Sequence, residues 1–281
     1  MAGELCTSGE VVVLGRRLHY AARGAGPAVL LIHGMGAASH AWDRLALPDF
    51  RLIAVDLPGC GRSELVDGPQ APNDLAFLLH ELMRELGHRS YSVVGHSLGA
   101  LVGLELALMR SEYVRAAVLV DAAVKVSQAA HLLSVPLLAE VASAVGGALP
   151  VPRALIRLYL NFLFGDRRRI TEAVIEAYAR TTSNPQYLRV MVAEVKGLLS
   201  WTPGDRVKSL RVPTLVAWGE RDPFLPVALG ERFARLLPGA RFVALPGCGH
   251  APPDECPEAL GAIVVPFLKD QNALPVRAVR P

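Results

Sequence analysis

The chain has 281 residues, 52% of them hydrophobic and 20% charged, with a formal net charge of +3. This length suits one large domain, or one domain with an insertion, and it provides enough apolar residues for a sizeable core. The small charge and the lack of a basic face exclude nucleic acid as an expected partner. The sequence leaves the oligomeric state open.

The N-terminal ten residues lack a basic region followed by an apolar one, so we expect no signal peptide. The most apolar run, residues 132–149, contains Pro136, Glu140 and two glycines, and it is a poor candidate for a membrane span. We therefore expect a cytoplasmic protein without stable membrane insertion. Its cysteines have neither zinc-site nor redox-motif spacing, and we expect them to be reduced thiols: Cys6, Cys60, Cys248 and Cys256.

Short apolar runs recur along the chain and predict strands. Most are apolar throughout, which is typical of strands buried on both faces of a parallel sheet. The first two flank a glycine and are expected to form an antiparallel edge. In chain order the runs cover residues 11–14, 17–21, 28–32, 51–55, 91–94, 115–120, 214–218 and 241–245.

Helical patterns lie between these strands, at residues 73–86, 99–109, 227–237 and 257–268. The alternation predicts an α/β fold with a doubly wound, mostly parallel eight-stranded sheet flanked by helices. Residues 125–208 interrupt it with four helical patterns, at 131–145, 152–164, 170–181 and 186–199. We interpret this stretch as a helical cap inserted before the last two strands. The core then comprises residues 1–124 and 209–270, and residues 271–281 form a loose tail.

The segment GHSLG, residues 95–99, follows a buried strand and opens an apolar helix. This is the pattern of a nucleophile elbow, a sharp turn that points a serine hydroxyl above the carboxyl edge of the sheet. Side chains at Gly95 and Gly99 would crowd the neighbouring backbone. We therefore predict that Ser97 is a catalytic nucleophile; the alternative is a serine that only caps the helix.

A serine nucleophile needs a base and an acid that orients it. His250 is the best base, because it lies in a loop just after the last predicted strand. Asp222, in the turn after the preceding strand, is the predicted acid, which gives the chain order Ser, Asp, His. Glu220 and Asp121 are weaker candidates for the acid.

Two backbone amides are expected to stabilise the oxyanion. One belongs to Leu98, directly after the nucleophile, and the other to Met35, whose neighbouring glycines let the backbone approach closely. No metal or organic cofactor is needed for this chemistry.

Taken together, these motifs resemble the α/β-hydrolase superfamily over nearly the whole chain. The resemblance is carried by residues 31–36, 56–63, 95–99, 218–223 and 246–250. It implies that residues 56–63 form a structural turn and that the inserted helices are the family's cap. Epoxide hydrolases and haloalkane dehalogenases of this superfamily place aspartate where this chain has Ser97. The carbon–carbon hydrolases usually have asparagine where it has His96, so GHSLG is more similar to esterases and lactonases.

The cap is rich in large apolar residues, most of which are expected to pack in its interior. The remainder predict a pocket for a hydrophobic small molecule. The candidates for substrate contact are His40, His131, Leu133, Leu137 and Phe162.

The sequence thus predicts a serine hydrolase that cleaves an ester, lactone or thioester through an acyl-enzyme. Three alternatives stay open. The first is carbon–carbon bond hydrolysis of a diketone-type substrate, and the second is intramolecular acyl transfer to form a ring. The third is a ligand-binding protein that keeps the fold without turnover.

Overall fold

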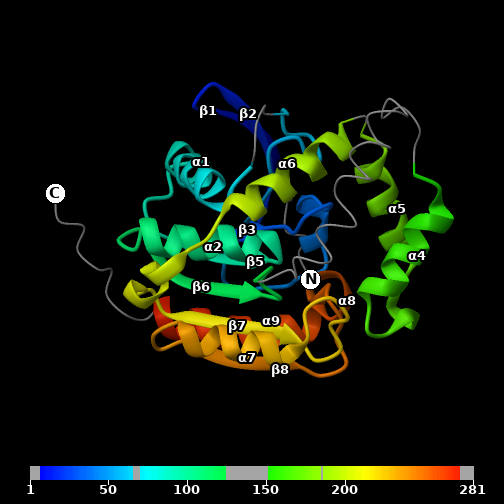
Figure 1. The fold of residues 1–281 in the computed structure, drawn as a ribbon. Helices are drawn as coiled ribbons and strands as arrows, with labels where there is room; N and C mark the ends of the chain where they lie inside the picture. Colours follow the sequence, from blue (N-terminus) through cyan, green and yellow to red (C-terminus); the bar gives the residue numbers. More distant parts are fainter. Residues whose placement is uncertain (1–6, 66–69, 125–150, 185, 273–281) are drawn as a thin grey trace.

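The computed structural model describes residues 7–65, 70–124, 151–184 and 186–272. Its centre is an eight-stranded sheet with the strand order β1-β2-β4-β3-β5-β6-β7-β8. In chain order the strands are β1 (Thr7–Val13), β2 (Arg16–Arg23), β3 (Ala28–Ile32), β4 (Arg51–Val55), β5 (Tyr91–His96), β6 (Val114–Val120), β7 (Thr214–Gly219) and β8 (Arg241–Leu245). Figure 1 shows this sheet running through the molecule.

The first two strands pair antiparallel with each other, and β2 pairs antiparallel with β4. All later pairs are parallel, beginning with β3 between β4 and β5. The predicted fold class and antiparallel edge are therefore confirmed. The apolar run of β3 explains its central place, because all five of its residues are buried.

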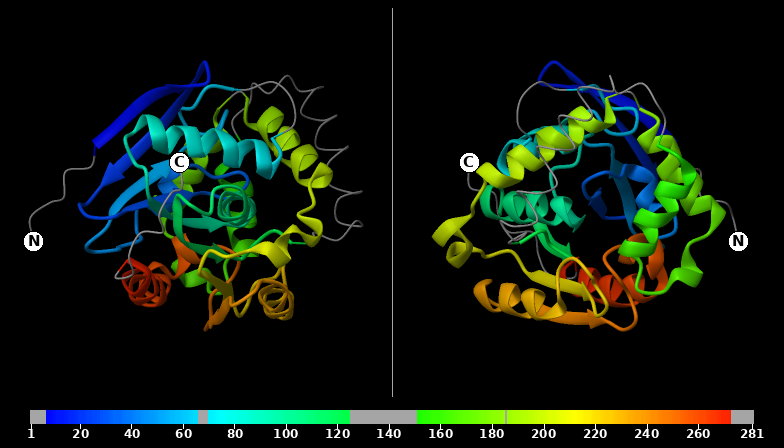
Figure 2. Two further views of the ribbon diagram at one scale, coloured as in Figure 1. Left: turned by 90° about the vertical axis from the view of Figure 1, so that its left-hand side faces the viewer. Right: turned by 45° about the vertical axis from the view of Figure 1, so that its right-hand side comes forward.

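Alternate residues of the strands enter two separate apolar layers. Leu30 and Ile32 of β3 pack with α1 (Pro72–Glu85), α2 (Leu98–Met109) and α7 (Val227–Leu236). Val29 and Leu31 face the other side, where α9 (Pro257–Asn272) and the short helix η1 (Ser39–Trp42) cover the sheet. Figure 2 shows helices on both faces. This sandwich holds the carboxyl ends of the parallel strands at one common edge.

Between β6 and β7, the described part of the chain forms helices α4 (Arg153–Leu163), α5 (Glu172–Thr182) and α6 (Tyr187–Ser200), with short turns η2 (Arg167–Arg169) and η3 (Gly204–Ser209). They match the predicted helices at 152–164, 170–181 and 186–199, whereas the one at 131–145 lies outside the described residues. Ile156 and Leu160 of α4 form a small core of their own with Ile175 and Tyr178 of α5. In Figure 1, α4 and α5 lie beyond the carboxyl ends of the strands.

One boundary differs from the expectation, and one helix is additional to it. Helix α9 extends through Asn272, so the predicted tail begins later than residue 271, and its remainder lies outside the described residues. A four-residue helix that the sequence analysis did not predict, α8 (Pro252–Glu255), follows the loop after β8. Throughout residues 7–65, 70–124, 151–184 and 186–272, no helix has the length and apolar character needed to cross a membrane.

Candidate active site

Ser97 lies in a strained turn between β5 and α2. Its φ is 53° and its ψ is −112°, a conformation that L-residues rarely adopt. A Cβ on Gly95 would meet the Gly99 carbonyl oxygen at 2.1 Å, and one on Gly99 would meet the Ile32 carbonyl oxygen at 2.2 Å. Both glycines are thus required by close backbone contacts, as expected from the sequence. Ser97 occupies the N-cap position of α2, but its side chain makes no capping hydrogen bond.

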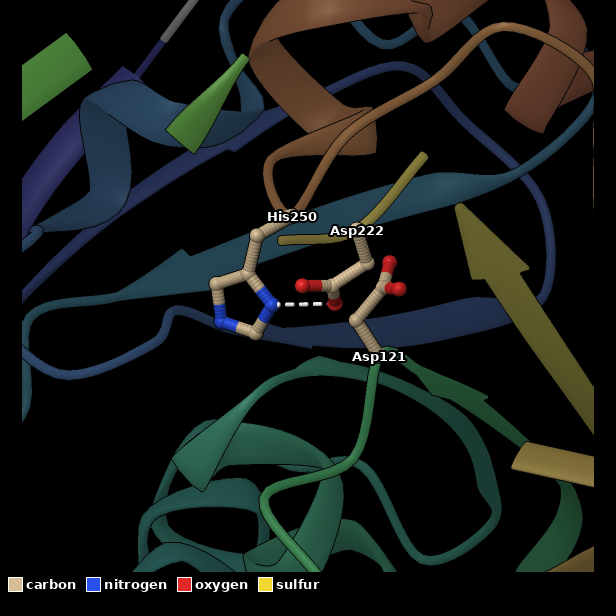
Figure 3. Close-up of side chains that lie close together, drawn as sticks. All are labelled: Asp121, Asp222 and His250. Atoms are coloured by element: carbon tan, nitrogen blue, oxygen red, sulfur yellow. Dashed lines mark hydrogen bonds and ion pairs between the residues drawn. The ribbon is translucent and has the colours of Figure 1, made fainter. Parts of the chain in front are cut away.

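The Ser97 hydroxyl instead faces His250. The His250 Nε2 lies 3.2 Å from the Ser97 Oγ, and the His250 Nδ1 lies 2.6 Å from the Asp222 Oδ2. Because a carboxylate only accepts hydrogen bonds, the Nδ1–H donates to Asp222, and the Nε2 is left to accept from the serine. Figure 3 shows the bond between His250 and Asp222. The structure therefore brings the three predicted residues together in one hydrogen-bonded chain.

The turn after β7 fixes the Asp222 carboxylate. Its Oδ1 accepts from the backbone amides of Phe224 and Leu225, at 2.8 and 2.9 Å. Glu220, the weaker candidate in the same turn, accepts instead from the Gly247 amide at an exposed position. Asp121 directly follows β6 and lies beside Asp222, on the side away from His250 (Figure 3). Its Oδ1 accepts a hydrogen bond from the Gly219 amide at 2.8 Å.

The loop that carries His250 is fastened at several points. The Gly249 amide donates to the Glu255 Oε2, and the His250 amide donates to the Leu163 carbonyl at the end of α4. The His96 Nε2 donates to the His250 carbonyl at 2.6 Å. Burial lowers the pKa of His96 to about 3, so this imidazole is neutral and acts as a fixed hydrogen-bond donor. These bonds hold the His250 ring against Asp222.

A disulfide also brackets this loop. Cys248 and Cys256 are joined, with their Cα atoms 6.2 Å apart. The expectation of reduced cysteines was wrong for this pair. The two cysteines meet because α8, which lies between them, turns the chain back on itself. Their spacing of eight residues does not reveal this turn. Cys60 is a free, buried thiol, and Cys6 lies outside the described residues.

The loop after β3 lies directly beside the elbow. A Cβ on Gly34 would meet the Ser97 Cβ at 3.0 Å, so the backbone at Gly34 passes close to the serine. His33 holds this loop, because its Nδ1 faces the Gly34 carbonyl at 2.8 Å and its Nε2 accepts from the Leu57 amide at 3.0 Å. Burial lowers its pKa, which keeps the ring neutral in this role. Met35 and Leu98 therefore lie on the two backbone segments that flank Ser97.

Among the predicted substrate-contacting residues, Phe162 is linked to His250 through the ring of Phe224. Its ring packs edge-on against Phe224 at 4.4 Å, and the Phe224 ring lies 5.4 Å from that of His250. The two phenylalanines are 51% and 44% exposed, which is unusual for large apolar side chains. Phe162 and Phe224 together form an aromatic wall beside the site.

The other candidates for substrate contact have different positions. His40 packs edge-on against Tyr178 of α5 at 5.5 Å, and burial lowers its pKa to about 4. It contacts the inserted helices rather than the elbow. The three remaining candidates, His131, Leu133 and Leu137, lie outside the described residues.

Sequence reasoning missed Glu194, a fully buried residue of α6. Its Oε1 accepts from the Cys60 thiol at 3.6 Å, and its carboxyl group interacts with the Gly36 amide of the loop beside Ser97. Burial raises the pKa of Glu194 to about 8. The residue lines a small pocket together with Tyr187 and Asn184. A lone glutamate in an amphipathic helix carries no sequence signal for such a role.

Glu194→Gln should make the protein's stability less dependent on pH. A raised native pKa means that the folded protein holds a proton that the unfolded chain releases above its ordinary pKa of 4.5. Stability is therefore lost as pH rises from that value to about 8, by at most about 1.4 kcal/mol per pH unit. Urea unfolding across this range should give a shallower decline for the variant. Parallel declines in the two proteins would contradict the assignment of this proton to Glu194.

Comparisons with known proteins agree with this geometry. The model of the alpha/beta hydrolase family matches residues 29–263. A 2-hydroxy-6-oxononadienedioate/2-hydroxy-6-oxononatrienedioate hydrolase of Paraburkholderia phymatum is 28% identical over 267 residues, covering 90% of this chain and 91% of its own.

Two solved structures are similar over most of their length. The enol-lactonase of Burkholderia xenovorans is 25% identical with a TM-score of 0.81, covering 93% of this chain and all of its own. A thermophilic esterase of Thermogutta terrifontis is 25% identical with a TM-score of 0.78, covering 94% and 99%. The chain therefore belongs to the alpha/beta hydrolase family and is a hydrolase.

Proposed function

We propose that the protein is a serine hydrolase that cleaves an ester, lactone or thioester of a hydrophobic small molecule through an acyl-enzyme. The single observation that carries the proposal is the hydrogen-bonded chain from Ser97 through His250 to Asp222. A serine that only capped α2 would turn its oxygen to the helix amides, whereas this oxygen lies 3.2 Å from a histidine nitrogen.

In the first half of the reaction, the Ser97 Oγ attacks the substrate carbonyl while the His250 Nε2 takes its proton. Asp222 stabilises the imidazolium that forms, through the bond to the His250 Nδ1. The amides of Leu98 and Met35 donate to the developing oxyanion, and each such donor typically contributes about 10²–10³ in turnover. His250 then gives the proton to the leaving alcohol or thiol, and the acyl-enzyme remains.

In the second half, water enters and His250 removes its proton. The resulting hydroxide attacks the acyl carbonyl, and collapse of the tetrahedral intermediate returns the proton to Ser97. Water is the co-substrate of this cycle, and the cycle includes no redox step.

The inserted helices are proposed to act as a cap that supplies the apolar part of the substrate site. The aromatic wall supports this, because Phe162 comes from α4 and Phe224 from the turn that carries Asp222. The hydrogen bond that the His250 backbone amide donates to the Leu163 carbonyl joins the end of α4 to the catalytic loop. A hydrophobic acyl or ring group would therefore lie between the inserted helices and Ser97.

Carbon–carbon bond hydrolysis is a second candidate. The Paraburkholderia phymatum relative is named for a hydroxy-oxo-dienedioate substrate, whose keto and enol groups make it a vinylogous diketone. The same serine and histidine could serve such a reaction. His96 does not support a direct substrate role for the residue before the serine, because its ring is bonded to the His250 carbonyl.

A substrate panel separates the two candidates. Purified protein is assayed with p-nitrophenyl esters of increasing chain length and with vinylogous diketones, at matched concentrations. We expect kcat/KM to be higher for the esters. A clear preference for the diketones would assign the protein to carbon–carbon hydrolysis, and binding without turnover of either class would assign it to ligand binding.

Phe162→Ala should weaken the preference for long acyl chains. Each methylene that the aromatic wall removes from water contributes up to about 0.8 kcal/mol. The ratio of kcat/KM for octanoate to that for acetate should therefore fall by about three- to tenfold. Leu236→Ala is the matched control, because Leu236 is also an exposed large apolar residue and lies at the end of α7. An unchanged ratio in Phe162→Ala would mean that the aromatic wall does not contact substrate.

A further inference from the structure

Asp121 is a buried carboxyl group that the proposed mechanism does not use. It directly follows β6 with a φ of 44°, and its side chain is fully buried. One ligand atom from each of Asp121, Asp222 and His250 lies within 4.8 Å of the others. Two carboxyl groups therefore share one small buried space, and Figure 3 shows them side by side.

The hydrogen bonds of the pair are unequal. Asp222 accepts three, from the His250 ring and from the amides of Phe224 and Leu225. Asp121 accepts one, from the Gly219 amide, and its Oδ2 has no hydrogen-bond partner within the described part of the chain. Hydrogen bonds to a charged carboxylate stabilise it, so the negative charge belongs on Asp222. Two buried carboxylates this close cannot both carry a charge at moderate cost.

A proton on Asp121 accounts for the closeness of the two carboxyl groups and for the unpartnered Oδ2. It removes the repulsion, and it turns the unpartnered Oδ2 into a donor with an acceptor beside it. Burial, followed by the charge of Asp222, raises the pKa of Asp121 well above its ordinary value. The other titratable groups that face this space are Glu255 of α8, His250 and His96.

We propose that Asp121 is a positioning residue that acts through Asp222. Its carboxyl group stays protonated and donates a hydrogen bond to the Asp222 carboxylate, and so limits the charge that Asp222 presents to His250. The role rests on the proposed function, because it matters only if His250 acts as the base for Ser97.

The test compares Asp121→Asn with Asp121→Leu. Asparagine keeps a hydrogen-bond donor and loses only the titratable proton, whereas leucine has a similar shape and no donor. The readout is the pH dependence of the rate at which a fluorophosphonate labels the protein, which reports the serine and histidine without requiring the natural substrate.

We expect Asp121→Asn to keep the midpoint of the wild-type pH profile. Asp121→Leu should move it upward, because an unsolvated Asp222 charge holds the histidine proton more strongly. If Asp121 were ionised instead, its removal in Asp121→Asn would lower the midpoint by about one pH unit or more. That result would overturn the proposal. Failure of the wild-type protein to be labelled at any pH would instead contradict the proposed function.

A second measurement covers the case in which the leucine variant fails to fold. Infrared difference spectra of wild type and Asp121→Asn, near neutral pH, isolate the carboxyl group that is lost. The wild-type protein should show the carbonyl band of a protonated carboxylic acid. A carboxylate band in its place would overturn the proposal without reference to activity.

Discussion

Replacing Ser97 with alanine is expected to abolish turnover while leaving the fold intact. The variant keeps the Cβ that packs against Gly34 and loses only the oxygen that faces His250. Loss of a catalytic nucleophile typically lowers kcat by several powers of ten, so residual activity should be below about a thousandth of wild type. The measurement is kcat on the best p-nitrophenyl ester, with the melting temperature as a check on folding.

Ser183→Ala is the matched control, because Ser183 is an exposed serine at the end of α5 that bonds only to the local backbone. It should retain wild-type turnover. If the folded Ser97→Ala variant kept more than about a thousandth of the wild-type rate, covalent catalysis by Ser97 would be wrong.

Asp222→Asn is expected to lower kcat by about 10³–10⁴. The asparagine amide cannot stabilise the imidazolium. Its NH₂ group would face the His250 Nδ1–H, which in the wild-type protein donates to the Asp222 Oδ2, so two donors would meet. The ring would turn or change tautomer, and its Nε2 would no longer be available as a base. The change should appear mainly in kcat rather than in KM, since Asp222 is buried and does not contact substrate.

Glu220→Gln provides the comparison within the same turn. Its carboxylate bonds to the Gly247 amide at the surface, so the variant should lose little activity. A larger loss in Glu220→Gln than in Asp222→Asn, with both proteins folded, would move the acid to position 220.

The sheet could be predicted because its signal is local. Runs such as residues 28–32 and 51–55 are apolar throughout, and the strands β3 and β4 have these same bounds. The sequence signal of the nucleophile elbow is equally local, since its two glycines, its serine and the start of the following helix lie within a few residues. The positions of Asp222 and His250 followed from topology, because the carboxyl ends of parallel strands meet at one edge.

Features that depend on tertiary contacts escaped the sequence analysis. The disulfide forms because α8 folds the chain back on itself, and the spacing of Cys248 and Cys256 does not reveal this. Glu194 approaches Gly36 only because α6 crosses the loop after β3. Phe162 was singled out as one of many apolar residues, whereas its partner Phe224 lies in a turn with no helical or strand pattern. None of these contacts follows a helical or strand periodicity, so the sequence pattern does not reveal them.

The topology of the sheet leaves both Asp121 and Asp222 as candidates for the acid that orients His250. Asp121 follows the strand next to the one that precedes Asp222, so both acids were placed at the same edge from the sequence alone. The number of hydrogen bonds at each carboxyl group distinguishes them, with three at Asp222 and one at Asp121. That asymmetry depends on the exact path of the turn after β7.

The most direct test of the proposed mechanism is covalent labelling by a fluorophosphonate, followed by mass spectrometry of the intact protein and of its peptides. The Ser97 oxygen should displace fluoride and form one phosphonyl adduct per chain, located on the peptide that contains Ser97. Ester hydrolysis should fall in proportion to the labelled fraction, and Ser97→Ala should remain unlabelled. Hydrolysis that continued at the full rate after complete labelling of Ser97, or an adduct confined to another residue, would contradict the mechanism.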